Sequence, residues 1–354
     1  MPKVVSIGVA DAPYSYSQSE VKDFVAGLFS DSGEFIQKMI RVFDNSGIEF
    51  RHFINEKDWY SKPRTFVERN SVYLNNARAM AARALSACIE EAGLGASEVE
   101  HIIFVSSTGI STPTIDAVLY NEFDFDSHIK RTPIWGSGCL GGAVGLSRAM
   151  EFTRAYADSC VLVVAVELCS LAFQLGDCTK SNVVASALFS DGAACALVVG
   201  AEHRLHHLPG VSLIDSMSTT YPDTLDVMGW DVSDSGLRVI FSKDIPTIVR
   251  GLVKDSIVEL LYGRGLELEQ VVRYLAHPGG MKILQAYRDA LGLGEKSLEI
   301  SKEVLRTHGN MSSPTVLYVL KDYLRSGAGK EGELGIITAL GPGFGSELIL
   351  FEFE

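Results

Sequence analysis

The stretch Arg131-Thr-Pro-Ile-Trp-Gly-Ser-Gly-Cys139-Leu-Gly-Gly-Ala143 decides the fold of this chain. A short apolar run leads into Gly136 and Gly138, and a helical pattern continues from Cys139 to about residue 157. This pattern predicts a tight turn that carries a thiol at a helix N-terminus, where unpaired N–H groups and the helix dipole favour an anion. We therefore expect a lowered thiol pKa. A buried, inert cysteine is the alternative, because most free cysteines are core residues and thiolate chemistry also needs a base.

The composition indicates a compact globular protein. With 354 residues, the chain is long enough for two domains or for one duplicated unit. The formal net charge of −13 argues against nucleic acid or an anionic membrane as the main partner. No stretch reaches the uncharged apolar length of a membrane span. Because residues 1–7 lead directly into a strand pattern, we expect no signal peptide.

The cysteines indicate reduced thiols. They show neither CxxC pairs nor a His-rich metal spacing, and they are Cys88, Cys139, Cys160, Cys169, Cys178 and Cys195. In a chain of this size we expect no disulfide framework, no metal site and a cytoplasmic location. His203, His206 and His207 lie in a polar connector without acidic or cysteine partners, and we interpret them as solvated loop residues.

One order of elements recurs in the two halves of the chain, although their sequence identity is slight. In the first half the pattern predicts strands over 4–10, 99–106 and 161–167, a Gly-broken strand pair over 187–200, and helices over 20–29, 32–43 and 71–92. In the second half it predicts helices over 245–262, 281–291 and about 310–323, strands over 271–276 and 334–340, and a Gly-broken strand over 341–353. This alternation predicts an α/β protein with mostly parallel sheets and a boundary between residues 201 and 202.

Three chemically capable side chains fall at the same edge of these predicted layers. Cys139 and Asn310 begin helices, and His277 ends a strand, so they converge where sites form in α/β folds. Each has an ordinary structural explanation alone, and His308 competes with His277 as the base. Together, Cys and His can form a thiolate–imidazolium pair that accepts an acyl group. Asn adds an N–H donor for an enolate or an oxyanion.

Four strings around these positions carry a resemblance to a known family. They are Gly-Ser-Gly-Cys139-Leu-Gly-Gly, Ala276-His-Pro-Gly-Gly280, Gly309-Asn-Met-Ser-Ser313 and Gly341-Pro-Gly-Phe-Gly345. Together they resemble a type III polyketide synthase, the chalcone-synthase-like branch of the thiolase superfamily, over nearly the whole chain. The second and third strings differ in wording from ketoacyl-ACP synthase III, which shares the Cys-His-Asn set. Thiolases differ further, because they use a second cysteine.

This resemblance implies a thiolase-like fold with two pseudo-repeated α/β halves in αβαβα layers, and a homodimer. Residues 1–201 would carry the nucleophile, and residues 202–354 would carry the histidine and the asparagine. Cys139 would accept an acyl group from a starter, which we expect to be a fatty acyl-CoA thioester. His277 and Asn310 would then hold malonyl-CoA and stabilise the enolate left by decarboxylation. The extended chain would cyclise to a pyrone or a resorcinol, and neither metal nor redox cofactor is needed.

The resemblance also implies binding residues. Lys38 and Arg41 match basic residues that contact CoA in the family, whereas a third such position is Asn45, and Lys243 is a further candidate. Gly279 and Ser312 belong to the matched strings. The CoA-binding positions of the family are therefore matched only in part, at Lys38 and Arg41 but not at Asn45.

The cavity side of the site departs from the plant pattern. Phe189 matches one gatekeeper phenylalanine, although a core aromatic on a strand is the alternative. Val239 stands where the second is expected, with Phe241 two residues further on. Three small residues suggest room for a long aliphatic chain, namely Thr112, Cys169 and Ala172. Trp230 falls near a position that is glycine in the plant enzymes and would shorten the cavity.

Two other functions remain open from the sequence. A ketoacyl synthase III-like enzyme of fatty acid initiation would take its malonyl group from an acyl carrier protein. It would need a basic docking patch, and the acidic composition of this chain gives no sign of one. A catalytically silent acyl-CoA-binding homologue would have no need of Cys139, His277 and Asn310 together.

Overall fold

The computed structural model describes residues 1–30, 38–242 and 244–354 of the chain. Its strands are β1 Lys3–Asp11, β2 Tyr14–Ser17, β3 Phe50–Phe53, β4 His101–Val105, β5 Lys130–Ile134, β6 Cys160–Leu168, β7 Asp191–Val199, β8 Val211–Thr220, β9 Met228–Ser233, β10 Gly236–Phe241, β11 Val271–Ala276, β12 Leu334–Gly341 and β13 Gly345–Phe353. The described α-helices are α1 Gln18–Leu28, α3 Lys57–Tyr60, α4 Phe66–Ala92, α5 Ile115–Tyr120, α6 Gly141–Ala155, α7 Lys180–Leu188, α8 Ile245–Tyr262, α9 Met281–Leu291, α10 Glu299–His308 and α11 Ser313–Arg325.

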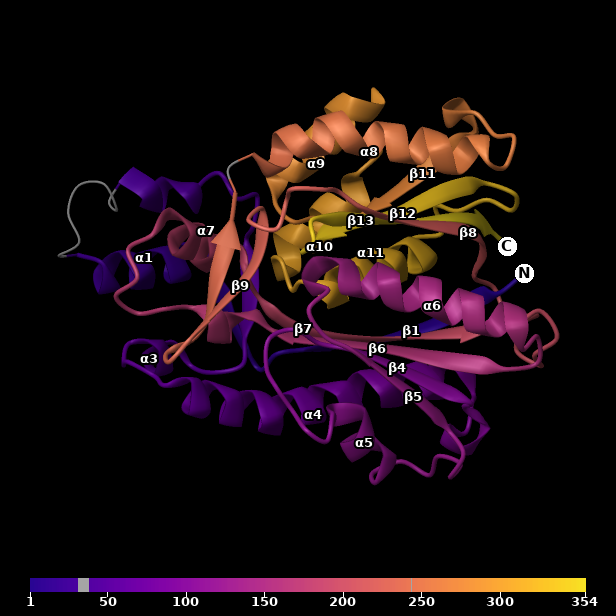
Figure 1. The fold of residues 1–354 in the computed structure, drawn as a ribbon, viewed down its shortest axis with the longest axis horizontal. Coiled ribbons are helices and arrows are strands. Elements are labelled where there is room, and N and C mark those ends of the chain that lie inside the picture. Colours follow the sequence, from indigo (N-terminus) through magenta and orange to yellow (C-terminus); the bar gives the residue numbers. More distant parts are fainter. Residues whose placement is uncertain (31–37, 243) are drawn as a thin grey trace.

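The main elements stack in five layers, helix–sheet–helix–sheet–helix (Figure 1). Helices α4 and α5 pack on the outer face of one half-sheet, and α8 and α9 pack on the outer face of the other. Helices α6 and α11 lie between the two half-sheets and contribute to one shared hydrophobic cluster. Each of these three packing zones is a separate hydrophobic core. Burial of apolar surface in such cores is the dominant favourable contribution to the free energy of folding. The predicted αβαβα arrangement is confirmed.

The two half-sheets repeat one strand order. The first runs β1-β7-β6-β4-β5 and the second runs β8-β13-β12-β11. They join into a nine-stranded sheet through β1 and β8, which pair over only two positions, Lys3 with Ser212 and Val4 with Val211. The order of elements that repeats in the sequence is therefore also a repeat of topology.

The prediction of mostly parallel sheets is wrong. Parallel pairing is confined to β4 with β5 and β6, and to β11 with β12. The other pairings of the nine-stranded sheet, those that involve β1, β7, β8 and β13, are antiparallel. In the second half the glycine-rich turn over residues 341–345 explains this, because a hairpin returns beside its own strand in the opposite direction.

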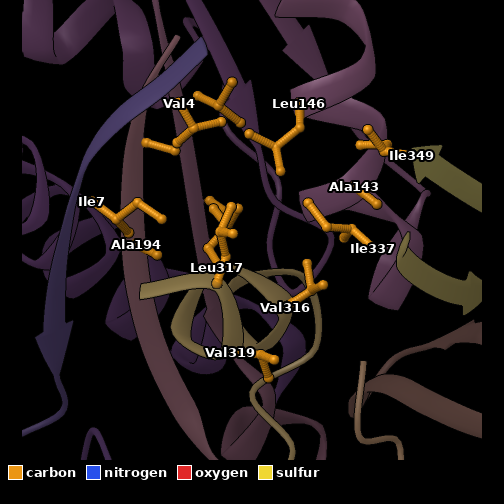
Figure 2. Packing of buried hydrophobic residues seen from close by; sticks show 14 of the residues in the cluster. Val4, Ile7, Ala143, Leu146, Ala194, Val316, Leu317, Val319, Ile337 and Ile349 are labelled. Atoms are coloured by element: carbon orange, nitrogen blue, oxygen red, sulfur yellow. The ribbon is translucent and has the colours of Figure 1, made fainter. Parts of the chain in front are cut away.

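The central helices approach each other closely. A Cβ at Gly142 in α6 would lie 2.3 Å from the carbonyl oxygen of Ser313 at the start of α11. Figure 2 shows side chains of both helices packed among residues of both half-sheets; its labels mark Val4, Ile7, Ala143, Leu146, Ala194, Val316, Leu317, Val319, Ile337 and Ile349. Small residues in α6 therefore let the N-terminal ends of the two helices lie side by side.

Helix α4 is the long amphipathic helix that the pattern places over residues 71–92, but it begins earlier, at Phe66. Thr65 and Glu68 form a capping box at its start, a signal of the Thr-x-x-Glu type. Gly93 ends it with a left-handed φ of 64°, as expected for a residue that follows a helix. Its small buried residues pack on β1 and β7.

Two local predictions need correction. Residues 187–200 do not form a strand pair: α7 ends at Leu188, Phe189 is its C-cap, and β7 begins only at Asp191. The helix expected over residues 32–43 lies partly outside the described residues, and its described end contains a short 3-10 helix, Ile40–Val42. Among the described residues, no helix has both the length and the apolar character needed to cross a membrane.

Candidate active site

Cys139 lies in a 3-10 helix, Gly138–Leu140, that leads directly into α6. The backbone N–H of Gly138 donates to the Ser107 hydroxyl oxygen at 3.1 Å, which fixes the turn to the loop after β4. Gly138 has a φ of 48°, and a Cβ there would lie 2.9 Å from Cδ of Pro342. Glycine is needed at this position for both reasons. The glycine-rich hairpin of the second half thus lies against the cysteine turn.

Asn310 lies opposite the thiol. Its Oδ1 is 3.9 Å from Cys139 Sγ and also accepts the backbone N–H of Ser312 at 2.8 Å. Its Nδ2 donates to the carbonyl oxygen of Gly279 at 3.3 Å. Ser312 is the N-cap residue of α11 and has a φ of 59°, an unusual conformation for a residue with a side chain. The amide of Asn310 is therefore held between two backbone segments and directed at the thiol.

His277 directly follows β11, where its backbone N–H donates to the Thr338 carbonyl of β12 at 2.7 Å. The side chain is buried, and its Nε2 would lie 3.8 Å from a Cβ placed on Gly279. Neither ring nitrogen has a hydrogen-bond partner within the described parts of the chain. Asn310 binds the carbonyl of Gly279. Gly279 therefore lies between the imidazole of His277 and the amide of Asn310.

Burial dominates the electrostatics of this site. It raises the pKa of Cys139 to about 11, an effect that the Glu167 charge reinforces and that the Ser312 hydroxyl and Asn310 amide oppose. Burial also lowers the pKa of His277 to about 3. The direction is opposite to the expected lowering of the thiol pKa, because burial is the largest cause of the shift. Both shifts favour a neutral thiol and a neutral imidazole over a thiolate–imidazolium pair at neutral pH.

Glu167 is a buried member of the site that the sequence reasoning did not single out. Its carboxylate accepts from the Ser107 backbone N–H at 2.9 Å, the Thr108 hydroxyl at 2.8 Å and the Ser313 hydroxyl at 3.1 Å. Burial raises its pKa to about 7. A signal was present, because an acidic residue near the end of an otherwise apolar strand, β6, calls for an explanation.

An aromatic cluster stands beside Cys169. The ring centroid of Phe189 lies 6.0 Å from that of Trp230 and 5.6 Å from that of Phe241. Val239 packs against the same cluster. Phe241 rather than Val239 therefore supplies a second phenylalanine ring next to Phe189, and Trp230 supplies a third aromatic ring.

A small apolar cavity of about 40 Å³ adjoins this cluster. Cys169 and Phe189 line one side of it. The rest is lined by side chains of α1, β3, α3 and α7 and by Ser170 and Phe173, and among them are Val21, Phe24, Val25, Arg51, Phe53, Tyr60 and Ala185. Cys139, His277 and Asn310 do not line it. Cys169 lies near Cys139, since a charge on the Cys139 sulfur would raise the pKa of Cys169 further, beyond the effect of burial.

The remaining predicted residues are more scattered. Ala172 is buried in the 3-10 helix Cys169–Ala172, whereas Thr112 lies on an exposed loop and does not line the cavity. Lys38 and Arg41 are exposed, and Lys243 lies outside the described residues.

His308 packs elsewhere. Its Nε2 is 3.6 Å from Asp11, and its ring contacts those of His52 and Tyr318. Of the two histidines, His277 is therefore the one whose ring lies near Gly279, the residue whose carbonyl Asn310 binds. In the parts of the chain that the structure describes, no three His, Cys, Asp or Glu side chains group as metal ligands.

Comparisons with known proteins show the family to which this chain belongs. Residues 3–203 match the family model for the N-terminal domain of chalcone and stilbene synthases, and residues 212–352 match the model for their C-terminal domain. A protein of Bacillus subtilis (strain 168), provisionally named a chalcone synthase, is 42% identical over 100% of this chain and 99% of its own length. The 1,3,6,8-tetrahydroxynaphthalene synthase of Streptomyces peucetius subsp. caesius is 33% identical over 99% of this chain and 93% of its own.

A solved structure shows the same fold. The 1,3,6,8-tetrahydroxynaphthalene synthase from Streptomyces coelicolor A3(2), a bacterial type III polyketide synthase, superimposes with a TM-score of 0.94 at 28% identity and covers 99% of both chains. The chain therefore belongs to the chalcone and stilbene synthase family and is a type III polyketide synthase. It is an acyltransferase that catalyses decarboxylative condensation.

Proposed function

We propose that Cys139 carries the growing acyl chain and that His277 and Asn310 activate malonyl-CoA. The Cys139 sulfur attacks the thioester of a starter acyl-CoA as its proton passes to His277. His277 then gives this proton to the CoA sulfur, so CoA leaves as its thiol. Malonyl-CoA then binds with its thioester oxygen toward His277 and Asn310. Loss of CO₂ leaves an enolate that attacks the acyl thioester on Cys139 and frees the sulfur.

One observation carries this proposal: the 3.9 Å approach of Asn310 Oδ1 to Cys139 Sγ beside a buried His277. Burial raises the pKa of Cys139 and lowers that of His277, so the proposed transfer of the thiol proton to the imidazole requires substrate binding to change the surroundings of both groups. The unpaired ring nitrogens of His277 supply both an acceptor for that proton and a donor for the malonyl oxygen.

We further propose a fatty acyl starter, with the product released as a pyrone or a resorcinol. The apolar cavity beside Cys169 and Phe189 supports this, because its side chains suit the end of an aliphatic chain. Its 40 Å³ corresponds to about three water-sized groups at 10–15 Å³ each, so a longer chain needs side chains to move. Trp230 contacts Phe189, which lines this cavity, and we propose that it limits the length of the starter.

The proposed CoA-binding residues are Lys38 and Arg41, which are both exposed in the helical segment that ends before Phe43. Their positive charges suit the phosphates of CoA. Replacing both by alanine is expected to raise the KM for malonyl-CoA and to leave kcat nearly unchanged. Lys243 is a further candidate, and Gly279 and Ser312 are proposed to border the malonyl group, since both contact Asn310.

The test of function is incubation with malonyl-CoA and a series of acyl-CoA thioesters, followed by mass analysis of the products. Lactone products indicate pyrone release, and decarboxylated aromatic rings indicate aldol closure. A product built from malonyl-CoA alone, or equal use of every chain length, would overturn the fatty acyl starter. Activity with malonyl-ACP but with no CoA pair would favour the ketoacyl synthase alternative, and binding without turnover would favour the silent homologue.

We also propose a cytoplasmic homodimer with an internal boundary between residues 201 and 202. Six free cysteines favour a reducing compartment. The exposed Trp135, whose Nε1 donates to the Gly109 carbonyl at 3.1 Å, and the exposed Ile110 form an apolar surface next to the edge strand β5. Trp135→Glu is expected to shift a dimer toward monomer in light-scattering measurements, and a monomeric wild-type chain would overturn the proposal.

A further inference from the structure

Arg51 in β3 is fully buried, and the proposed chemistry does not use it. Its Nη1 donates to the carbonyl oxygens of Ser186 at 2.6 Å and Phe189 at 3.1 Å. Its guanidinium also lies over the rings of Phe43 and Phe53, at 5.7 and 5.1 Å from the ring centroids. A buried cation with such defined contacts requires a structural or functional reason.

The contacts of Arg51 lie at the C-terminal end of α7, which has no basic residue in its last turn. Arg51 binds two of the carbonyls there, Gln18 Nε2 donates to the Ala187 carbonyl at 2.8 Å, and the backbone N–H of Asn310 donates to the Leu188 carbonyl at 2.9 Å. The last carbonyls of a helix have no partner within the helix, and a cation favours that end of the dipole. Residues from three distant segments thus supply hydrogen-bond donors to the carbonyls at the C-terminal end of α7.

The same helix end is bonded to Asn310 from both sides. The Asn310 carbonyl accepts the backbone N–H of Ser190 at 2.9 Å, so that Phe189 and Asn310 form a parallel bridge. Arg51 Cγ lies 3.1 Å from the position that a Cβ on Gly309 would take. Arg51 therefore binds one member of this bridge, the Phe189 backbone, and lies next to Gly309, the residue before the other member.

The charge of Arg51 is retained at neutral pH. Burial lowers the pKa of its guanidinium to about 9, and the carboxylate of Asp191 opposes that change. The Asp191 carboxylate is itself held by the backbone N–H groups of Ser170 and Ile54, both at 2.7 Å. Burial raises the pKa of Asp191 itself to about 7. A buried cation and a buried carboxyl group thus flank the segment between Phe189 and Asp191.

We propose that Arg51 is a positioning residue that holds the end of α7 against the segment of residues 309–310, and thereby sets the amide of Asn310 relative to Cys139. The proposal rests on the role of Asn310 proposed above. Small displacements of groups at a reacting centre can cost about 10²-fold in rate per ångström. Losing Arg51 therefore affects the step that needs Asn310 more than the step that needs Cys139 alone.

The test compares Arg51→Met and Arg51→Lys with the wild-type chain in two assays. One measures decarboxylation of malonyl-CoA without a starter, and the other measures acylation of Cys139 at saturating acyl-CoA by intact mass. Arg51→Met is expected to decarboxylate about 10²-fold more slowly while Cys139 is still acylated. Arg51→Lys is expected to fall in between, because an ammonium keeps the charge but lacks the planar fork.

Gln18→Leu is the matched control, because it removes one bond to the same helix end without touching Phe189 or Gly309. It is expected to lower the Tm but to keep the wild-type ratio of decarboxylation to acylation. The proposal is overturned if folded Arg51→Met decarboxylates at the wild-type rate, or if both variants lose the two activities in parallel with Tm. Failure of the wild-type chain to decarboxylate malonyl-CoA would instead overturn the role of Asn310.

Discussion

Cys139 and Asn310 lie 3.9 Å apart, Sγ to Oδ1, although 171 residues separate them in the chain. Each is placed by the start of a central helix, Cys139 just before α6 and Asn310 just before α11. The two helices belong to different halves of the repeated fold, so their closeness is a property of the central layer. The predictions below test this layer, the chemistry at the two residues and the space in front of them.

Replacing Asn310 tests the malonyl-activating group. An oxyanion donor contributes about 2.7–4 kcal/mol to transition-state stabilisation, so Asn310→Ala is expected to slow decarboxylation about 10²–10³-fold while Cys139 is still acylated. Asn310→Asp is the matched variant, because it keeps an acceptor for the Ser312 N–H but loses the amide donor. Decarboxylation of malonyl-CoA by either variant at the wild-type rate would show that the amide has no such role.

The pH dependence of thiol alkylation tests the buried state of Cys139. Deprotonation of a thiol of pKa about 11 requires rising pH, so its thiolate fraction grows about tenfold per unit between pH 7 and 10. Alkylation of Cys139 by iodoacetamide, followed by peptide mass analysis in a Cys178→Ser background, is expected to rise accordingly. That background removes the exposed cysteine. A rate that reaches a plateau by pH 8 would mean that the helix terminus outweighs burial.

A methyl group at Gly142 tests the packing of the central helices. Its Cβ would meet the Ser313 carbonyl oxygen at 2.3 Å, and such overpacking costs about 1–3 kcal/mol of folding free energy. We expect Gly142→Ala to lower the free energy of unfolding by this amount in urea titrations and to reduce condensation as well. Gly251→Ala is the control, because a Cβ at this exposed position of α8 meets nothing within 4 Å. Helix propensity predicts a neutral or slightly stabilising effect there, and equal losses in both variants would refute the packing argument.

Trimming Trp230 tests what limits the starter. Its ring packs against Phe189 beside the apolar cavity, so Trp230→Ala is expected to raise kcat/KM for long acyl-CoA starters relative to short ones. One methylene in a hydrophobic pocket changes discrimination by about 10–200-fold at most, and a shift of about tenfold is therefore a measurable outcome. Val232→Ala, on the exposed side of the same hairpin, is the control. An unchanged preference in Trp230→Ala would place the limit elsewhere in the cavity.

Several elements follow from local sequence alone. The expected bounds of α8 and α9 agree with the structure at both ends, because apolar periodicity within a helix and the residues that end it are local features. The prediction for residues 187–200 failed because the apolar, glycine-containing run reads as strand although its first part is the end of α7. Short apolar runs of this kind do not distinguish helix from strand.

The candidate site, like the fold, was predicted from the sequence only in part. The matched strings identified Cys139, His277 and Asn310, but Glu167 was missed because its partners come from the loop after β4 and from α11. The sequence also predicted the wrong direction for the shift of the Cys139 pKa. A helix N-terminus is visible in a glycine-rich turn, whereas the desolvation that opposes it depends on which side chains close over the sulfur.

The sequence by itself thus determined the order of elements, the repeat of that order and the three chemically capable residues, since periodicity, caps and glycine turns are encoded over short distances. Only the tertiary structure decided the strand directions, the burial of the thiol and imidazole, and the position of Arg51, which binds the Phe189 carbonyl and lies next to Gly309. These depend on packing between layers, where residues far apart in the chain exclude water from one another and so set each other's charge and position.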